Sequence, residues 1–159
     1  MAVSTRWTSA MALAFLAAVL VGGGYWLLRA SAPMGLLRPD DATVVVRGRA
    51  VYAQHCAQCH GADLAGQLRW RERGPDGLLP APPHDRSGHT WHHTGDVLFN
   101  LTKYGVQRYA GAEYKSAMPR YEGVLADQDI VAVLSYIKST WPSDVRQLHD
   151  QLEASQRKQ

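Results

Sequence analysis

The residues Cys56-Ala57-Gln58-Cys59-His60 place two thiols three positions apart, with an imidazole directly after the second. On a helical turn, thiols at this spacing can reach the two vinyl groups of one porphyrin, while the next imidazole points at the iron. A structural zinc site needs four ligands, and these are the chain's only two cysteines. A disulfide that happens to precede a histidine is the remaining alternative. The motif predicts one covalent haem c, attached through Cys56 and Cys59, with His60 as the proximal iron ligand.

A second axial ligand decides what such a haem does, because histidine and methionine together saturate the iron and suit it to electron transfer. Of the four methionines, Met118 is the best placed, since it lies in a loop that Pro119 directs and that a helix soon follows. We therefore predict Met118 as the second iron ligand. Two alternatives stay open, namely a methionine that fills a gap in the core and a histidine that replaces Met118 on the iron.

Hydrophobic periodicity predicts an all-α domain. In the segment 127–138, apolar residues recur at the spacing of one helix face, with Asp127 as the expected N-cap. The segment 49–55 is expected to form a helix that ends at the haem motif. A third helix is expected over residues 96–104, with Asp96 as its cap and Gly105 as its stop.

These features together resemble a class I c-type cytochrome, over residues 47–142. The resemblance rests on Gly48 and Tyr52 in the first helix, on the haem motif with Gly61, on Ser116-Ala117-Met118-Pro119, and on the closing helix with Trp141-Pro142. It implies the class I cytochrome c fold around one covalently attached haem. It also implies that Gly48 and Tyr136 meet where the first and last helices cross.

The N-terminal residues carry a different signal. Residues 10–28 are almost wholly apolar and uncharged, and Arg6 and Arg29 flank them. This length is about that of a bilayer-spanning helix, and Trp7 and Trp26 lie where interfacial aromatics lie. We predict a single transmembrane anchor over residues 1–29, with a cleaved signal peptide as the alternative. Three further segments are predicted after the anchor. They are a linker over 30–43, a cytochrome domain over 44–142 and a polar, partly helical tail over 143–159. In the tail, Val145, Leu148 and Leu152 are spaced as a weak apolar stripe.

The long irregular stretch of residues 66–95 is expected to border the haem, because loops of this length usually serve a site. A proline carbonyl, from Pro80, Pro82 or Pro83, is expected to accept a hydrogen bond from His60 Nδ1. Donors for the haem propionates are sought in the same stretch, and the candidates are Trp70, Arg71, Arg73 and Trp91.

Four histidines also lie in this stretch, at positions 84, 89, 92 and 93. Such a concentration of imidazoles can bind copper or zinc. Hydrogen bonding to propionates and to the loop backbone is the simpler interpretation. A copper-binding module that uses His84 to His93 is therefore the alternative function from another class.

Taken together, the sequence predicts an electron carrier rather than an enzyme, with no small-molecule substrate. The expected partners are a redox donor protein and a terminal oxidase or reductase. A formal net charge of +3 is too weak to indicate nucleic-acid binding. The resemblance implies that haem c is attached outside the bacterial cytoplasmic membrane. If residues 1–29 form a single-pass anchor, the haem domain is therefore expected to face the periplasm. A fixed haem subunit of a larger oxidoreductase complex is the further alternative.

Overall fold

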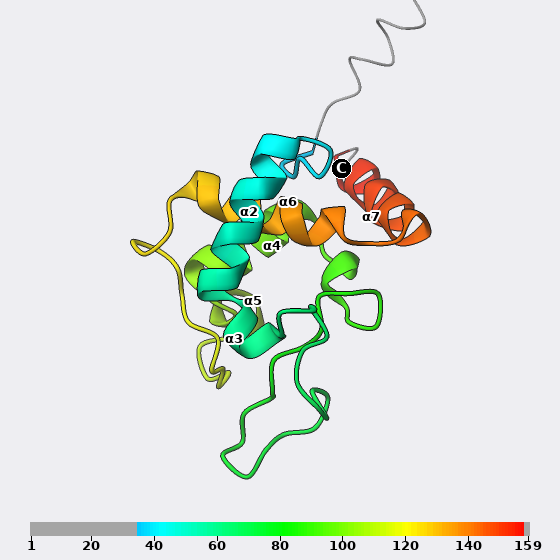
Figure 1. Cartoon of the computed structure of the whole chain (residues 1–159). Coiled ribbons are helices and arrows are strands. Elements are labelled where there is room, and N and C mark those ends of the chain that lie inside the picture. Colours follow the sequence, from blue (N-terminus) through cyan, green and yellow to red (C-terminus); the bar gives the residue numbers. More distant parts are fainter. Residues whose placement is uncertain (1–34, 158–159) are drawn as a thin grey trace, which may run out of the picture. The chain divides into compact units, whose positions relative to one another are not determined.

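A computed structural model describes residues 35–157, in which the regular elements are all helices and no β-strand occurs (Figure 1). The all-α prediction is confirmed for this part of the chain. The predicted anchor over residues 1–29 lies outside the described residues. Between residues 35 and 157, no helix has the length and apolar character needed to cross a membrane.

Helix α2 (Ala42–His55) begins earlier than the predicted segment 49–55. The reason is Asp41, whose carboxylate accepts hydrogen bonds from the backbone N–H groups of Thr43 and Val44 and so caps the helix. The residues just before it, predicted as linker, pack on the domain. Leu37 belongs to the core, and the Arg38 N–H donates to Ser135 Oγ at 2.9 Å.

Helix α6 (Asp127–Ser139) crosses α2 and supplies more buried apolar side chains than any other described element (Figure 1). Its predicted apolar face is confirmed, since Ile130, Val133 and Ile137 are all buried. At the crossing, a Cβ atom on Gly48 would stand 2.0 Å from the Ala132 carbonyl oxygen and 2.8 Å from Tyr136 Cβ. Only glycine allows this approach, so the predicted meeting of Gly48 and Tyr136 is confirmed.

Two helix caps differ from those predicted. Helix α4 (Gly95–Tyr104) is capped by Thr94 rather than Asp96, because the Thr94 hydroxyl accepts from the Val97 N–H. The N-cap of α6 is Ala126, while Asp127 lies in the first turn and pairs with Lys103 Nζ at 2.6 Å. Gly105 ends α4 with φ of 91°, as predicted. The short helix α5 (Gln107–Ala110) follows it.

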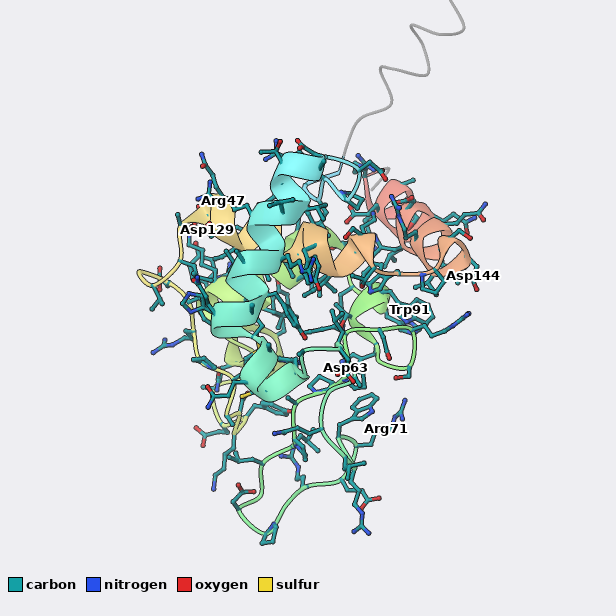
Figure 2. The ribbon with its side chains drawn as sticks, viewed as in Figure 1. Arg47, Asp63, Arg71, Trp91, Asp129 and Asp144 are labelled. Carbon is teal, nitrogen blue, oxygen red and sulfur yellow. The ribbon has the colours of Figure 1, made fainter. Side chains whose placement is uncertain are left out.

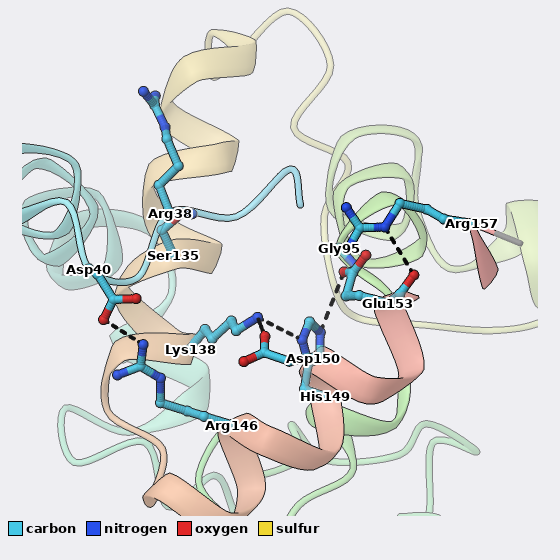
Figure 3. A network of polar contacts seen from close by, with 10 residues as sticks. All are labelled: Arg38, Asp40, Gly95, Ser135, Lys138, Arg146, His149, Asp150, Glu153 and Arg157. Carbon is cyan, nitrogen blue, oxygen red and sulfur yellow. Dashed lines mark hydrogen bonds and ion pairs between the residues drawn. The ribbon is translucent and has the colours of Figure 1, made fainter. Parts of the chain in front are cut away.

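Helix α7 (Ser143–Gln156) forms most of the C-terminal tail. Its buried face is not the predicted stripe of Val145, Leu148 and Leu152, since Leu148 is exposed and the buried residues are Val145, His149 and Glu153. The sequence pattern failed here because two of the three buried side chains are polar. Figure 3 shows the polar contacts of these two side chains, in which Glu153 Oε1 accepts from the Gly95 N–H at the start of α4.

The stretch of residues 66–95 is irregular, as predicted, apart from the 3-10 helix η1 (Thr90–His92). Part of it extends away from the helices as a long loop (Figure 1). Hydrogen bonds close this loop at its base, where the Gln67 N–H donates to the Ala81 carbonyl at 2.9 Å. Leu68, near the base, is 93% exposed.

Candidate functional site

The two cysteines and the histidine of the motif lie where α2 passes into the short helix α3 (Ala57–His60). Cys56 is half-buried against the core, Cys59 is exposed, and both are free thiols. Burial, and then the charge of the neighbouring Cys59, raise the pKa of Cys56 to about 11. His60 is buried at the end of α3, directly before Gly61, which turns the chain with φ of 79°.

The imidazole of His60 is fixed in one tautomer. Its Nδ1 lies 2.8 Å from the Pro82 carbonyl oxygen. A carbonyl oxygen can only accept, so Nδ1 carries the hydrogen and Nε2 keeps its lone pair. Burial lowers the pKa of His60, although the hydrogen bond to Pro82 opposes this effect. A neutral imidazole with a free Nε2 is the form that binds a metal ion.

Backbone contacts hold Pro82 against His60. Gly66 has φ of 68°, and a Cβ there would stand 2.5 Å from Pro83 N and 2.6 Å from the Pro82 carbonyl carbon. The Gly66 N–H also donates to the His60 carbonyl at 2.8 Å. On the other side, the buried Tyr52 hydroxyl donates to the Gly61 carbonyl at 2.8 Å. Glycine at 66 and tyrosine at 52 therefore position the turn that carries the imidazole.

Met118 lies in a loop before α6, as predicted, and its backbone N–H donates to Ser116 Oγ at 3.1 Å. Its side chain is half-buried and packs against the same hydrophobic core as Cys56. Met118 also lines an open cavity of about 420 Å³, together with four neighbours. These neighbours are Tyr104, Gln107, Pro119 and Arg120.

Tyr121 connects the methionine loop to the haem motif, and sequence reasoning did not identify it. Its ring is buried, and its hydroxyl donates to the His55 carbonyl at 2.7 Å, one residue before Cys56. Its backbone N–H donates to Thr102 in α4. No local pattern marks this tyrosine, because its partner lies 66 residues away in the chain.

The four residues predicted as propionate donors make other contacts among the described residues. Arg71 lies 3.9 Å above the Trp70 ring, and Figure 2 shows it on the long loop. Arg73 donates to the Gly77 carbonyl at 2.7 Å and lies over Tyr114. The Trp91 N–H donates to the Arg86 carbonyl at 3.4 Å. Both arginines are exposed, so their guanidinium groups can still reach a ligand, and their role stays a prediction.

The four loop histidines do not gather into a metal site. His89 stacks on Trp70 with ring centroids 5.4 Å apart, and His92 stacks on Trp91 at 3.7 Å. His84 stacks instead on His60, at 4.0 Å. Over residues 35–157, no group of three or more His, Cys, Asp or Glu side chains is arranged to hold a metal ion. These imidazoles contact aromatic rings and one another, and His84 also contacts the Thr90 hydroxyl.

A helical domain that joins two free thiols, a neutral imidazole and a loop methionine is of the haem-binding electron-transfer class. The sequence profile of the cytochrome c family matches residues 45–141, more than half of the chain, and the chain belongs to this family. Comparison with curated proteins gives no match, and comparison with solved structures gives none. The family implies a covalently bound haem c, an electron-transfer role and redox proteins as partners.

The residues present fit this cofactor. Cys56 and Cys59 form no disulfide, so both sulfur atoms are available for thioether bonds. The donor set of imidazole nitrogen and thioether sulfur suits iron. The lone pair of His60 Nε2 is left available by the hydrogen bond at Nδ1.

Proposed function

We propose that this protein is a monohaem electron carrier in which His60 and Met118 are the axial ligands of the iron. Cys56 and Cys59 hold the porphyrin through thioether bonds. The observation that carries the proposal is the 2.8 Å contact between His60 Nδ1 and the Pro82 carbonyl, next to two free thiols. This contact leaves Nε2 unprotonated, and it makes the ring a stronger donor to a metal.

The haem supplies a one-electron couple between ferric and ferrous iron. The role of the protein is to hold that couple in a saturated, largely apolar setting. With Met118 on the iron, no coordination position would be left for oxygen or a substrate, and the Pro82 carbonyl would keep His60 oriented. Electron transfer then needs only contact with a partner, so we infer a carrier rather than a catalyst.

We further propose that residues 1–29 anchor the carrier in the bacterial cytoplasmic membrane, with the haem domain in the periplasm. The support is the uncharged apolar run of residues 10–28 between Arg6 and Arg29. An anchor confines the domain to the membrane surface and raises its effective concentration near membrane-bound partners. A respiratory donor and a terminal oxidase or reductase are partners of the expected kind.

The test is spectroscopy of the full chain purified in detergent. A pyridine haemochrome assay should give one haem c for each chain, and the oxidised protein should show the weak near-red band of sulfur-to-iron charge transfer. Cys59→Ala removes one of the two thioether bonds and should shift the haemochrome band. Absence of the near-red band from the unsubstituted protein would reject Met118 as a ligand, and absence of haem would reject the whole proposal.

A further inference from the structure

A second imidazole, that of His84, lies against the face of His60. The two ring centroids are 4.0 Å apart and the ring planes differ by 22°, which is a stacked arrangement. This pair is separate from the hydrogen bond at Pro82, which engages the edge of the His60 ring. His60 is therefore contacted on an edge by one residue of the loop and on a face by another.

His84 is itself held from several sides. Its backbone N–H donates to the Leu64 carbonyl at 2.8 Å, and its own carbonyl accepts from the Trp141 indole N–H at 2.7 Å. Its ring also makes an edge contact with Tyr52, with centroids 6.3 Å apart. Since Tyr52 and Trp141 are both buried, these contacts fix the backbone and one side of the ring.

The rotation of the His84 side chain is set by Thr90. His84 Nδ1 lies 2.8 Å from the Thr90 hydroxyl oxygen, and Thr90 is buried at the start of η1. The turn between them is tight, because a Cβ on Gly88 would stand 2.0 Å from the Pro83 carbonyl oxygen. The loop thus places both Pro82 and His84 against His60.

The two contacts restrict different motions of the His60 ring. A carbonyl oxygen accepts a hydrogen bond over a broad range of directions, so the contact at Nδ1 permits the ring to tilt. A parallel ring against the face opposes that tilt through close packing. The orientation of a ligating imidazole affects the electronic structure of a low-spin iron, and partners of the ligand set that orientation.

We propose that His84, held by Thr90, is a positioning residue that fixes the plane of the proximal imidazole His60. The inference rests on the proposed function, since it requires His60 to ligate the iron. It extends that function to a stacked imidazole pair on the proximal side of the haem. The histidine cluster thereby receives one specific role, which belongs to His84 alone.

The test compares Thr90→Val with Thr90→Ser in the full chain with its haem. Valine keeps the shape of threonine but removes the hydroxyl, whereas serine keeps the hydroxyl. The readouts are the g values of the ferric iron, measured by electron paramagnetic resonance, and the ferric-to-ferrous equilibrium against a mediator. We expect Thr90→Val to displace or split the g values and to change the equilibrium constant by about threefold, the lower end of what one hydrogen bond contributes. Thr90→Ser should match the unsubstituted protein.

His84→Leu, which removes the stacked ring, should broaden or split the same signals. Unchanged g values in both Thr90→Val and His84→Leu would overturn the proposal. If His84→Leu does not acquire haem, the comparison of Thr90→Val with Thr90→Ser tests the proposal by itself. Failure of the proposed function gives a different result, because the unsubstituted protein would then lack a low-spin signal with histidine and methionine ligation.

Discussion

The two proposed iron ligands are held with unequal firmness. His60 ends a helix, is buried, and has its ring fixed by the Pro82 carbonyl. Met118 lies in a loop, where its own backbone is held by Ser116 and where Tyr121 ties the following segment to His55. A methionine sulfur is also a weaker donor than an imidazole nitrogen. The bond between Met118 and the iron is therefore expected to break more readily than the bond between His60 and the iron.

Met118→Ala tests this asymmetry. We expect haem to stay attached, because both thioether bonds and His60 are untouched, while the sixth position of the iron opens. Carbon monoxide should then bind the reduced variant readily, and the change is measured by visible spectroscopy. The control is the unsubstituted protein, and equal carbon monoxide binding by both would show that Met118 does not saturate the iron.

Gly66 is the residue whose replacement should disturb the proximal side. Alanine there has to adopt a positive φ and also collides with the backbone of Pro82 and Pro83. We expect Gly66→Ala to lower the free energy of unfolding by about 3 kcal/mol, as strain and overpacking add. Chemical denaturation followed by circular dichroism measures the loss.

The matched control for this change is Gly77→Ala. Gly77 has a similar φ of 78°, but a Cβ there meets nothing within 4 Å. Its replacement should cost only the backbone strain, about 1 kcal/mol. Equal losses at the two positions would mean that the approach of residue 66 to the Pro82 segment contributes nothing.

At the scale of helices, α7 is the element that lies beyond the family match. It packs through a buried polar centre. His149 is fully buried, and its Nδ1 lies 3.0 Å from Nζ of Lys138, which is itself only 5% exposed (Figure 3). Because the ammonium group can only donate, Nδ1 accepts and the neutral ring carries its hydrogen on Nε2. That Nε2 has no hydrogen-bond partner and lies 3.8 Å from Glu153 Oε1.

This centre predicts a pH dependence of stability. Burial, and then the Lys138 charge, lower the pKa of His149, although the carboxylates of Glu153 and Asp150 and the His93 backbone oppose the shift. The folded protein then binds fewer protons than the unfolded chain between the two pKa values. The free energy of unfolding should therefore be highest above the ordinary histidine pKa of about 6.5, and should fall as the pH drops below it.

His149→Gln isolates this contribution. Glutamine can still accept from Lys138 but does not titrate, so the fall in stability between about pH 7 and pH 5 should be smaller in the variant. Some dependence should remain, because burial also lowers the pKa values of His89 and His93. Denaturation curves at several pH values provide the measurement, and parallel pH profiles would exclude His149 as a contributor.

At the scale of the molecule, the sequence predicted those parts that follow from local pattern. The apolar spacing of Ile130, Val133 and Ile137 placed α6 and its buried face correctly. The start of α2 was placed too late, because the capping role of Asp41 depends on a backbone turn that composition does not reveal. The buried face of α7 was wrong because His149 and Glu153 are buried through partners on other elements.

The same distinction applies to the site. The thiols and His60 follow from spacing alone, whereas Tyr121 contacts His55 and His84 contacts His60 only because loops fold back across the domain. The expected proline carbonyl had three candidates, and Pro82 is the one found 2.8 Å from His60. Contacts between residues that are far apart in the chain can be identified only from the tertiary structure, because no local sequence pattern indicates them.

The whole chain should behave as a tethered domain. If residues 1–29 span the bilayer, the protein should stay with the membrane fraction through washes with high salt and with carbonate, and detergent should release it.

A chain that begins at Gly35 should instead be exported, when fused to a cleavable signal, as a water-soluble domain with the same haem spectrum. Its independence is expected because the described residues 35–157 form their own compact unit. Release of the full chain by salt alone would contradict the anchor, and co-purification of the full chain with a stable partner in detergent would favour a fixed subunit over a free carrier.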